Sequence, residues 1–509
     1  MTWLKQAIPL DRPEYSKQTE ALLTDLLWRS PGSSLYLAGS QNSYLEEHLA
    51  KRTAPTGEPL DRIVYAKTGK KTQKVVESLP IAQTTNVQAL IDGAKAADCL
   101  HAILETLKAP RSRSYRSVSS VPLHPDLVVL QTLPGIVNKQ SPPNVARIIE
   151  EVGRLGGSDG VGAVASRFLR ASQTNIPATS GISGCVGALF PRIAEHVWAQ
   201  LGVLGATQSS TPWPDWPRVV PQPYAPTAGP VGSTLPRTPF RWFWDKWQIL
   251  CDPANGWTEK LPQRRWVDWS LSLLRTALAF AYLWEAELFC RIRDRLVERN
   301  SAGDGPARER LNAFLEGQFT LAPVQPSWVP PSQKRVWDSL SSTLAKGYVV
   351  RKALDEWIGD SGNSSPSGNS FSSAIVQWID GLSPDELRRL AGPIVIPRTT
   401  ANNTKEFVKY LMLPRSADDD SSDQGDLYFL ARSNRSSFWV ELGPEWLVVE
   451  TALLARRPDG KCTLRQLLDD IGMLGISIDR RTLVTLLEEA GLSADSPDAD
   501  DALVIESGF

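Results

Sequence analysis

Histidine, cysteine and methionine are scarce in this chain of 509 residues, which holds four, five and three of them. The four histidines are widely separated, and none of the five cysteines lies in a CxxC pair. A zinc site needs several such ligands at close spacing, so we expect no metal site and no other cofactor. Scattered cysteines, odd in number, also argue against a disulfide framework and fit a reducing cytoplasm. The histidines are His48, His101, His124 and His196, and the cysteines are Cys99, Cys185, Cys251, Cys290 and Cys462.

Long apolar runs are lacking as well. The most apolar window, from Leu271 to Trp284, contains Arg275 and falls short of the roughly twenty residues that cross a bilayer. The first residues, MTWLKQAIPLDRPEYSK, lack the apolar core of a signal peptide. We therefore expect a cytoplasmic protein that does not insert into a membrane.

The sequence motifs of several common enzyme classes are missing. No GxxxxGK[ST] motif of a P-loop occurs, and the GxGxxA pattern at Gly160 follows a predicted helix where a dinucleotide fold needs a strand. Ser183 lies in GISGC, which lacks the last glycine of a nucleophile elbow. No catalytic residue is assigned, and an enzyme of a class without these motifs stays open as an alternative.

Charge is balanced over the whole chain, with a net charge of -1, but it is unevenly distributed. Residues 1–170 carry 21 Lys and Arg against 16 Asp and Glu, a net charge of +5. Residues 385–509 carry 14 against 22, a net charge of -8. A nearly neutral chain does not attract nucleic acid or a membrane through its overall field. If acidic polymers bind, the N-terminal half is the better place for them.

Tryptophan is concentrated between Trp242 and Asn300, which hold seven of the eighteen in the chain. Apolar residues recur there every three or four positions from Trp266 to Leu296, which predicts one helix over about Gln263 to Arg299. A second apolar stripe, at Leu274, Leu278 and Ala281, lies on the opposite side of this helix. A helix that is apolar on both sides is buried, so other elements are expected to surround it.

The order of helical patterns, connectors and short strands predicts a mainly α, multi-domain protein with a small β component. Nine of the 28 residues from Pro212 to Pro239 are proline, a density that helices and central strands exclude. Within this arm, Trp213 and Trp216 are expected to dock on a partner surface, as are Trp242 and Trp244 just after it. The expected segments are an N-terminal mainly helical domain with basic loops, 1–206; a Pro-rich linker, 207–239; a Trp-rich helical core domain, 240–358; a helical connector with mobile loops, 359–425; and a β-hairpin followed by the C-terminal domain, 426–509.

The last part of the chain has the most specific pattern. Pro444 is suited to the first position of a helix that extends to about Arg457, and Thr463 and Asp479 are suited to capping two more. Residues 502–506 are expected to form a terminal strand. A turn over residues 474–478, which contains Gly475, separates the second and third helices, and Gly491 ends the third. Residues 444–509 therefore resemble a winged helix, through hydrophobic and glycine core positions. These positions are Leu464, Leu467, Leu468, Ile471, Gly475, Ile476, Ile478, Leu483, Leu486, Leu487, Gly491 and Leu492.

In winged helices that read DNA, the third helix enters the major groove and the wing contacts phosphates. Here Arg480 and Arg481 suit such a role, but Glu488 and Glu489 follow on the same helix. The expected wing carries Asp495, Asp498, Asp500 and Asp501, which oppose a phosphate backbone. The charges favour a winged helix that contacts protein, and a DNA reader is the alternative.

Two basic loops, residues 62–74 and 108–116, could hold phosphates and stack a base on an aromatic ring. The competing interpretation, a pair of solvated loops with no ligand, is the one that the sequence favours. Reversing the charge of Lys70, Lys71, Arg111 and Arg113 separates these interpretations through the affinity for DNA. The candidate nucleic-acid-binding residues are Lys67, Lys70, Lys71, Lys74, Arg111, Arg113, Tyr115, Arg116, Arg480 and Arg481.

Together these patterns favour a non-enzymatic adaptor or scaffold subunit of a bacterial multi-protein complex. Other protein subunits are the expected partners, with nucleic acid as a second partner if the complex serves antiviral defence or DNA processing. Tryptophan is enriched in cores and in interfaces, and long connectors suit a scaffold. The alternatives are a direct DNA- or RNA-binding protein and an enzyme of an unrecognised class.

Overall fold

The computed structural model describes only part of the chain, and every structural statement below concerns that part. The described residues are 3–13, 22–23, 26, 145–158, 162–175, 235, 237–301, 305–325, 336–361, 370–397, 399–414, 427–433, 438–492, 494–495 and 503–507.

The predicted central helix is confirmed as α13, Gln263–Asn300, and other helices lie along both of its sides. Its two apolar stripes are buried, including Trp266, Trp269 and Trp284. The helices that pack against it are α7 (Val145–Leu155), α11 (Pro239–Cys251), α12 (Trp257–Lys260), α14 (Pro306–Leu315), α15 (Val336–Ser361), α17 (Pro384–Ala391) and α18 (Asn402–Met412). Burial of the apolar side chains of these helices is the main force that holds the described part together.

The contact between α13 and α15 is unusually close. A Cβ atom added to Gly347 of α15 would lie 2.5 Å from the Cα atom and from the carbonyl oxygen of Ala286 on α13. Only glycine allows this separation, which brings the backbones of the two helices together over one wall of the pocket described below.

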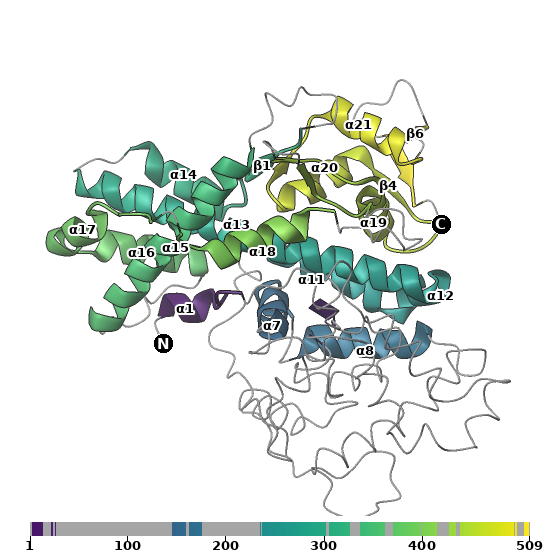
Figure 1. Cartoon of the computed structure of the whole chain (residues 1–509), viewed down its shortest axis with the longest axis horizontal. Coiled ribbons are helices and arrows are strands. Elements are labelled where there is room, and N and C mark those ends of the chain that lie inside the picture. Colours follow the sequence, from purple (N-terminus) through teal and green to yellow (C-terminus); the bar gives the residue numbers. More distant parts are fainter. Residues whose placement is uncertain are drawn as a thin grey trace, which may run out of the picture.

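Figure 1 shows how these helices and three others are arranged around the core. α14, α15 and α17 lie at one end with α16 (Phe371–Gly381), and the C-terminal elements lie at the other. Helices α7, α11, α12 and α8 (Ala163–Asn175) form a group below the C-terminal elements, and the short α1 (Trp3–Ala7) lies beside α7. Among the described helices, none has an apolar stretch long enough to cross a bilayer.

The β component consists of three small sheets. The predicted hairpin is present as β2 (Ala431–Ser433) antiparallel to β3 (Phe438–Val440), with Ala431 opposite Val440. β4 (Lys461–Thr463) and β6 (Ala494–Asp495) both pair antiparallel with β7 (Val504–Glu506), in the order β4-β7-β6. The third pair, β1 (Ala322–Pro323) with β5 (Ile476–Ser477), is parallel and joins the C-terminal elements to the segment after α14.

The C-terminal elements from α19 to β7, residues 444–507, are called the C-terminal module below. Its helices are α19 (Pro444–Leu454), α20 (Leu464–Met473) and α21 (Arg480–Glu489). The predicted caps are confirmed: Thr463 forms a capping box with Gln466, and Asp479 accepts the backbone N–H of Thr482 at 3.0 Å. Gly491 has a positive φ of 75° directly after α21, as its predicted role requires.

Three local predictions need correction. The helix from Pro444 ends at Leu454 and not near Arg457, because Arg456 and Asp459 have positive φ angles and turn the chain toward β4. The predicted turn over residues 474–478 includes strand β5. Helix α18 was not predicted at all.

The buried residues of the described part form one cluster that extends in sequence from Trp3 to Ile505. It contains residues from all five expected segments, and Leu235 is its member from the Pro-rich linker. The predicted boundaries of those segments stay predictions.

Candidate functional site

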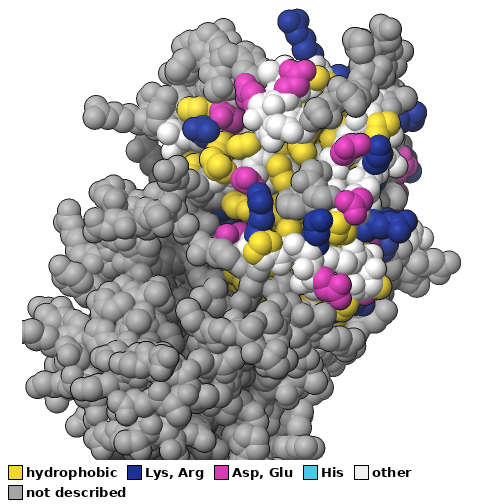
Figure 2. Space-filling view, turned by 90° about the vertical axis from the view of Figure 1, so that its right-hand side faces the viewer, with side chains coloured by type: hydrophobic (Ala, Val, Ile, Leu, Met, Phe, Trp, Pro, Cys, Tyr) yellow, Lys and Arg dark blue, Asp and Glu magenta, His cyan; other side chains and the backbone are white. Residues whose placement is uncertain are grey.

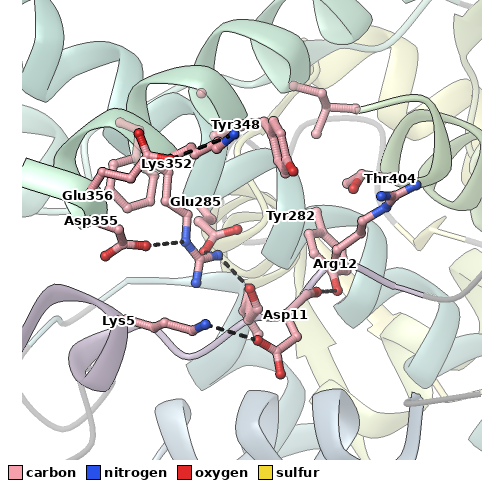
Figure 3. Close-up of a pocket in the computed structure, with 16 residues that line it drawn as sticks. Lys5, Asp11, Arg12, Tyr282, Glu285, Tyr348, Lys352, Asp355, Glu356 and Thr404 are labelled. Atoms are coloured by element: carbon pink, nitrogen blue, oxygen red, sulfur yellow. Dashed lines mark hydrogen bonds and ion pairs between the residues drawn. The ribbon is translucent and has the colours of Figure 1, made fainter. Parts of the chain in front are cut away.

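A pocket of about 320 Å³ lies between the N-terminal residues and helices α13, α15 and α18. Figure 3 shows Lys5 and Asp11 on the N-terminal side, facing Glu285 and Asp355 across the pocket. Rings and aliphatic side chains complete the wall, which is therefore part polar and part apolar. The lining residues are Lys5, Leu10, Asp11, Arg12, Tyr282, Glu285, Ala286, Phe289, Leu344, Gly347, Tyr348, Arg351, Lys352, Asp355, Glu356 and Thr404.

Arg351 of α15 connects three sides of this pocket. Its guanidinium donates to the carbonyl oxygens of Ile8 and Leu10 and to the carboxylate of Glu285. The Nε atom lies 3.7 Å from the carboxylate of Asp355 on the same helix. Tyr282 adds a second link, because its hydroxyl donates to the carbonyl oxygen of Asp11 at 2.6 Å. These bonds attach residues 8–11 to α13 and α15.

Burial alters the chemistry of two lining residues, Tyr282 and Glu285, and it raises the pKa of both. Burial raises the pKa of the Glu285 carboxyl to about 7, against the opposing effect of the Arg351 guanidinium. A carboxyl with this pKa can exchange a proton near neutral pH, which is the property of a general acid or base. In this structure Glu285 pairs with Arg351, which also binds the carbonyl oxygens of Ile8 and Leu10. The contacts of Glu285 therefore help to attach the N-terminal residues.

Other charges in the pocket wall also have partners within the chain. Lys5 lies 3.9 Å from Asp11, and Lys352 lies 3.7 Å from Glu356. Among the described residues, no three or more His, Cys, Asp and Glu side chains form a group that could hold a metal ion. The wall therefore provides paired charges and apolar surface, and we assign no ligand to it.

The altered pKa of Glu285 predicts a pH dependence of stability. Its folded pKa, about 7, lies above the roughly 4.3 of an unfolded chain, so its contribution is fully present below about pH 4 and is lost as the pH rises through 7. Between pH 4.5 and 7.5, the wild type should lose about 2–3 kcal/mol of unfolding free energy through this carboxyl. We expect Glu285→Gln to lack this loss. Urea denaturation of both proteins across this range measures the difference.

The control for this experiment is Glu356→Gln, because that side chain is 66% exposed and lies on the same pocket. Its stability should follow the wild-type curve at every pH. Parallel curves for the wild type and Glu285→Gln would contradict the prediction.

The second candidate surface is the outward face of α21 in the C-terminal module. Leu483, Leu486 and Leu487 are buried against the module, which fixes the orientation of the helix. Arg480 and Arg481 at its start, and Glu488 and Glu489 at its end, are exposed. Figure 1 shows α21 on the outer side of the module, away from α11 and α13.

Figure 2 views the side of the molecule on which the C-terminal module lies. Basic and acidic side chains alternate over its described surface, with hydrophobic side chains between them. Neither sign of charge forms a continuous field there. A nucleic-acid interface typically shows a basic stripe or patch, and this face has none among the described residues.

A buried cluster of charges joins the C-terminal module to α11. Lys246 of α11 lies 3.3 Å from Glu450 of α19 and 2.8 Å from Asp470 of α20. The indole N–H of Trp242 also donates to Glu450, at 3.3 Å. The side chains of Lys246 and Glu450 are 3% and 0% exposed. These three buried titratable groups connect α19 and α20 to α11.

Burial has opposite consequences for the two signs of charge in this cluster. It raises the pKa of Glu450 to about 8, against the effect of Lys246. Burial also acts to lower the pKa of Lys246, but Asp470 and Glu450 together raise it above its ordinary value. Lys246 is therefore charged at neutral pH, where Glu450 is mostly protonated and Asp470 is the main partner of the lysine.

The residues predicted from the sequence as binding residues fall into three groups. Arg480 and Arg481 are exposed at the start of α21. Trp242 and Trp244 are 1% and 4% exposed, so they pack inside the chain and offer almost no surface to a partner. The others lie outside the described residues: Lys67, Lys70, Lys71, Lys74, Arg111, Arg113, Tyr115, Arg116, Trp213 and Trp216.

Sequence reasoning did not identify the pocket or the buried charge cluster. Lys246 and Glu450 are 204 residues apart in the chain. The available signal was a charged residue within a stretch of otherwise apolar helix, as at Lys246 and Glu285, which implies a partner elsewhere but not which one.

Comparisons with protein families, with curated proteins and with solved structures found no match for this chain. The basis for a function is therefore the geometry of the described surfaces.

Proposed function

We propose that this chain is a non-enzymatic adaptor subunit whose C-terminal module is a winged helix that contacts another protein. The order of elements supports the winged-helix assignment. The module runs helix α19, strand β4, helices α20 and α21, then strands β6 and β7, and its sheet has the order β4-β7-β6. In this arrangement α21 takes the place of the helix that enters the major groove in DNA-reading winged helices.

The main support for a protein-contact role is the mixed charge of α21. Two arginines and two glutamates share its exposed side. Phosphates would be attracted by the first turn and repelled by the last, so the helix gains little from lying along a DNA groove. Protein surfaces can supply charges of both signs, and complementary charge at the edge of an interface selects the partner.

The attachment of the module supports the same role. α19 and α20 are fixed on α11 by the Lys246 cluster, and β5 pairs with β1. The exposed helix therefore projects from a body that holds it in one position. A rigid surface loses less entropy on binding than a flexible one, which favours an adaptor.

The experiment is a pull-down of the tagged chain from its native host, with and without nuclease, read by mass spectrometry and nucleic-acid staining. Protein partners that persist after nuclease treatment support the proposal. Partners that disappear together with the nucleic acid contradict it, because they would have been bridged by that nucleic acid.

The role of α21 is tested by Arg480→Glu with Arg481→Glu. Exposed ion pairs are each worth about 0.2–1 kcal/mol, so we expect roughly 2- to 30-fold weaker partner binding and no change in affinity for a DNA duplex. Lys352→Glu with Arg388→Glu is the matched control, since it makes the same change in charge at 66% and 69% exposed side chains away from the module. Equal binding by both double variants would contradict a role for α21.

A further inference from the structure

A short segment between α17 and α18, residues 392–397, exposes the most hydrophobic surface of any described loop. Val395 is 82% exposed and Ile396 is 41% exposed. Apolar side chains of this size are usually covered, and two adjacent ones on an ordered loop indicate a contact surface. Figure 1 shows α17 at the end of the molecule opposite the C-terminal module, so this surface is separate from α21.

The sequence of the segment, Gly-Pro-Ile-Val-Ile-Pro, favours an extended backbone. Each proline fixes its own φ and disfavours helix in the residue before it, here Gly392 and Ile396. Gly392 has φ -55° and ψ 163°, an extended conformation. The three residues between the prolines are β-branched, a type enriched in strands.

Both ends of the segment are held by hydrogen bonds. The guanidinium of Arg293 on α13 donates to the carbonyl oxygens of Leu390, Ala391 and Gly392. At the other end, the backbone N–H of Thr400 donates to the carbonyl oxygen of Pro397 at 3.0 Å. Ile394 packs against the core between these anchors. The two ends of the segment are thus fixed before any partner arrives.

The backbone groups between the prolines are available for hydrogen bonds to a partner. Within the described part of the chain, the amides of Ile394, Val395 and Ile396 make no hydrogen bond, and the segment belongs to no sheet. In a strand, the N–H and C=O groups of alternate residues point to the same edge, so Ile394 and Ile396 share one edge. The opposite edge has only the N–H of Val395, because its neighbours on that side are prolines.

We propose that residues 394–396 bind as an added strand to the exposed sheet edge of a protein partner. The edge with Ile394 and Ile396 supplies two donors and two acceptors, and Val395 faces away from the core into an apolar site of the partner. The flanking prolines limit the strand to three residues, which prevents open-ended pairing with other sheets. With α21 at the other end, the chain would hold two partners at separate sites.

The test begins with a photo-crosslinking amino acid at Thr399, an exposed position beside the segment, in the native host. The same amino acid at Val297, which is 40% exposed on α13, is the control. The protein cross-linked at 399 and not at 297 is then purified and added to the full chain. Hydrogen exchange of the backbone amides is measured with and without it.

Strand addition predicts at least about tenfold slower exchange at residues 394–396 in the complex. Val395→Asp with Ile396→Asp should weaken binding by at least about tenfold, while Val395→Thr with Ile396→Thr, which keeps the branched shape, should weaken it much less. Both double variants change side chains that are exposed in the structure, so their thermal midpoints should match that of the wild type. A matching midpoint excludes a folding defect.

Three results would overturn the proposal: a partner that leaves these amides unprotected, a cross-link only to a second copy of this chain, or no cross-link above the control. The Arg480→Glu, Arg481→Glu variant should keep this contact, so failure of the α21 proposal and failure of this one are distinguishable.

Discussion

Replacing Lys246 with methionine is expected to lower the free energy of unfolding by about 3–5 kcal/mol. The change leaves Glu450 and Asp470 facing each other with no compensating cation in a buried site. Glu450, with its pKa of about 8, is already mostly protonated at pH 7, so the main loss is the cation beside Asp470. Relief of the unpaired charge then means movement of α20 away from α11. Urea denaturation at pH 7 measures the loss.

Two comparisons make this result specific. Lys352→Met removes a lysine from an ion pair in which both side chains are 66% exposed, and it should cost less than about 1 kcal/mol. Lys246→Met combined with Glu450→Leu and Asp470→Leu replaces the whole cluster with apolar side chains and should recover most of the lost stability. A cost below about 1 kcal/mol for Lys246→Met alone would show that the cluster does not hold the module.

The same variant bears on the adaptor proposal. If the cluster fixes the module, Lys246→Met should loosen the presentation of α21 while leaving Arg480, Arg481, Glu488 and Glu489 unchanged. Partner binding through α21 should then weaken, and the triple variant should restore it together with stability.

Much of the helical framework could be predicted from the sequence because its causes are local. The spacing of Trp266, Trp269 and Trp284 gave the length and the burial of α13, and the caps at Thr463 and Asp479 gave the starts of two helices. Capping and periodicity act within a few residues, so a single sequence contains them.

Helix α18 escaped prediction because its start carries no such signal. Its cap position is Ala401, in a left-handed conformation with φ 56° and without a side-chain hydrogen bond. The helix is held by burial of Phe407, Val408, Leu411 and Met412 against the core. Tertiary packing of this kind outweighs a weak local preference, and the sequence of the eleven residues of α18 does not reveal it.

The candidate sites depend on contacts between distant residues. Glu285 meets Arg351 across 66 positions, and Arg351 meets Ile8 across 343. Strands β1 and β5 are two residues each, too short for any periodic pattern. The sequence does contain charged residues within apolar helical stretches, such as Glu285. Such a residue implies a partner elsewhere in the chain without identifying it.

Replacing Arg351 with methionine is the second change with a large expected effect, a loss of about 3–5 kcal/mol of unfolding free energy at pH 7. Methionine has similar length but donates no hydrogen bond, so the carbonyl oxygens of Ile8 and Leu10 lose their donors and Glu285 loses its cation. Because the pKa of Glu285 is already raised to about 7, loss of the cation should leave this carboxyl protonated at neutral pH.

Arg351→Lys distinguishes charge from geometry at this position. Lysine keeps the positive charge beside Glu285 but cannot reach two carbonyl oxygens and two carboxylates with a planar fork. We expect it to recover part of the loss, and we expect hydrogen exchange near residues 8–12 to stay faster than in the wild type. If both variants leave that exchange unchanged, the N-terminal residues are held by the burial of Trp3, Leu4 and Ile8 and not by Arg351. If only methionine accelerates it, the charge of Arg351 suffices, and the pocket wall is then maintained by the ion pair with Glu285.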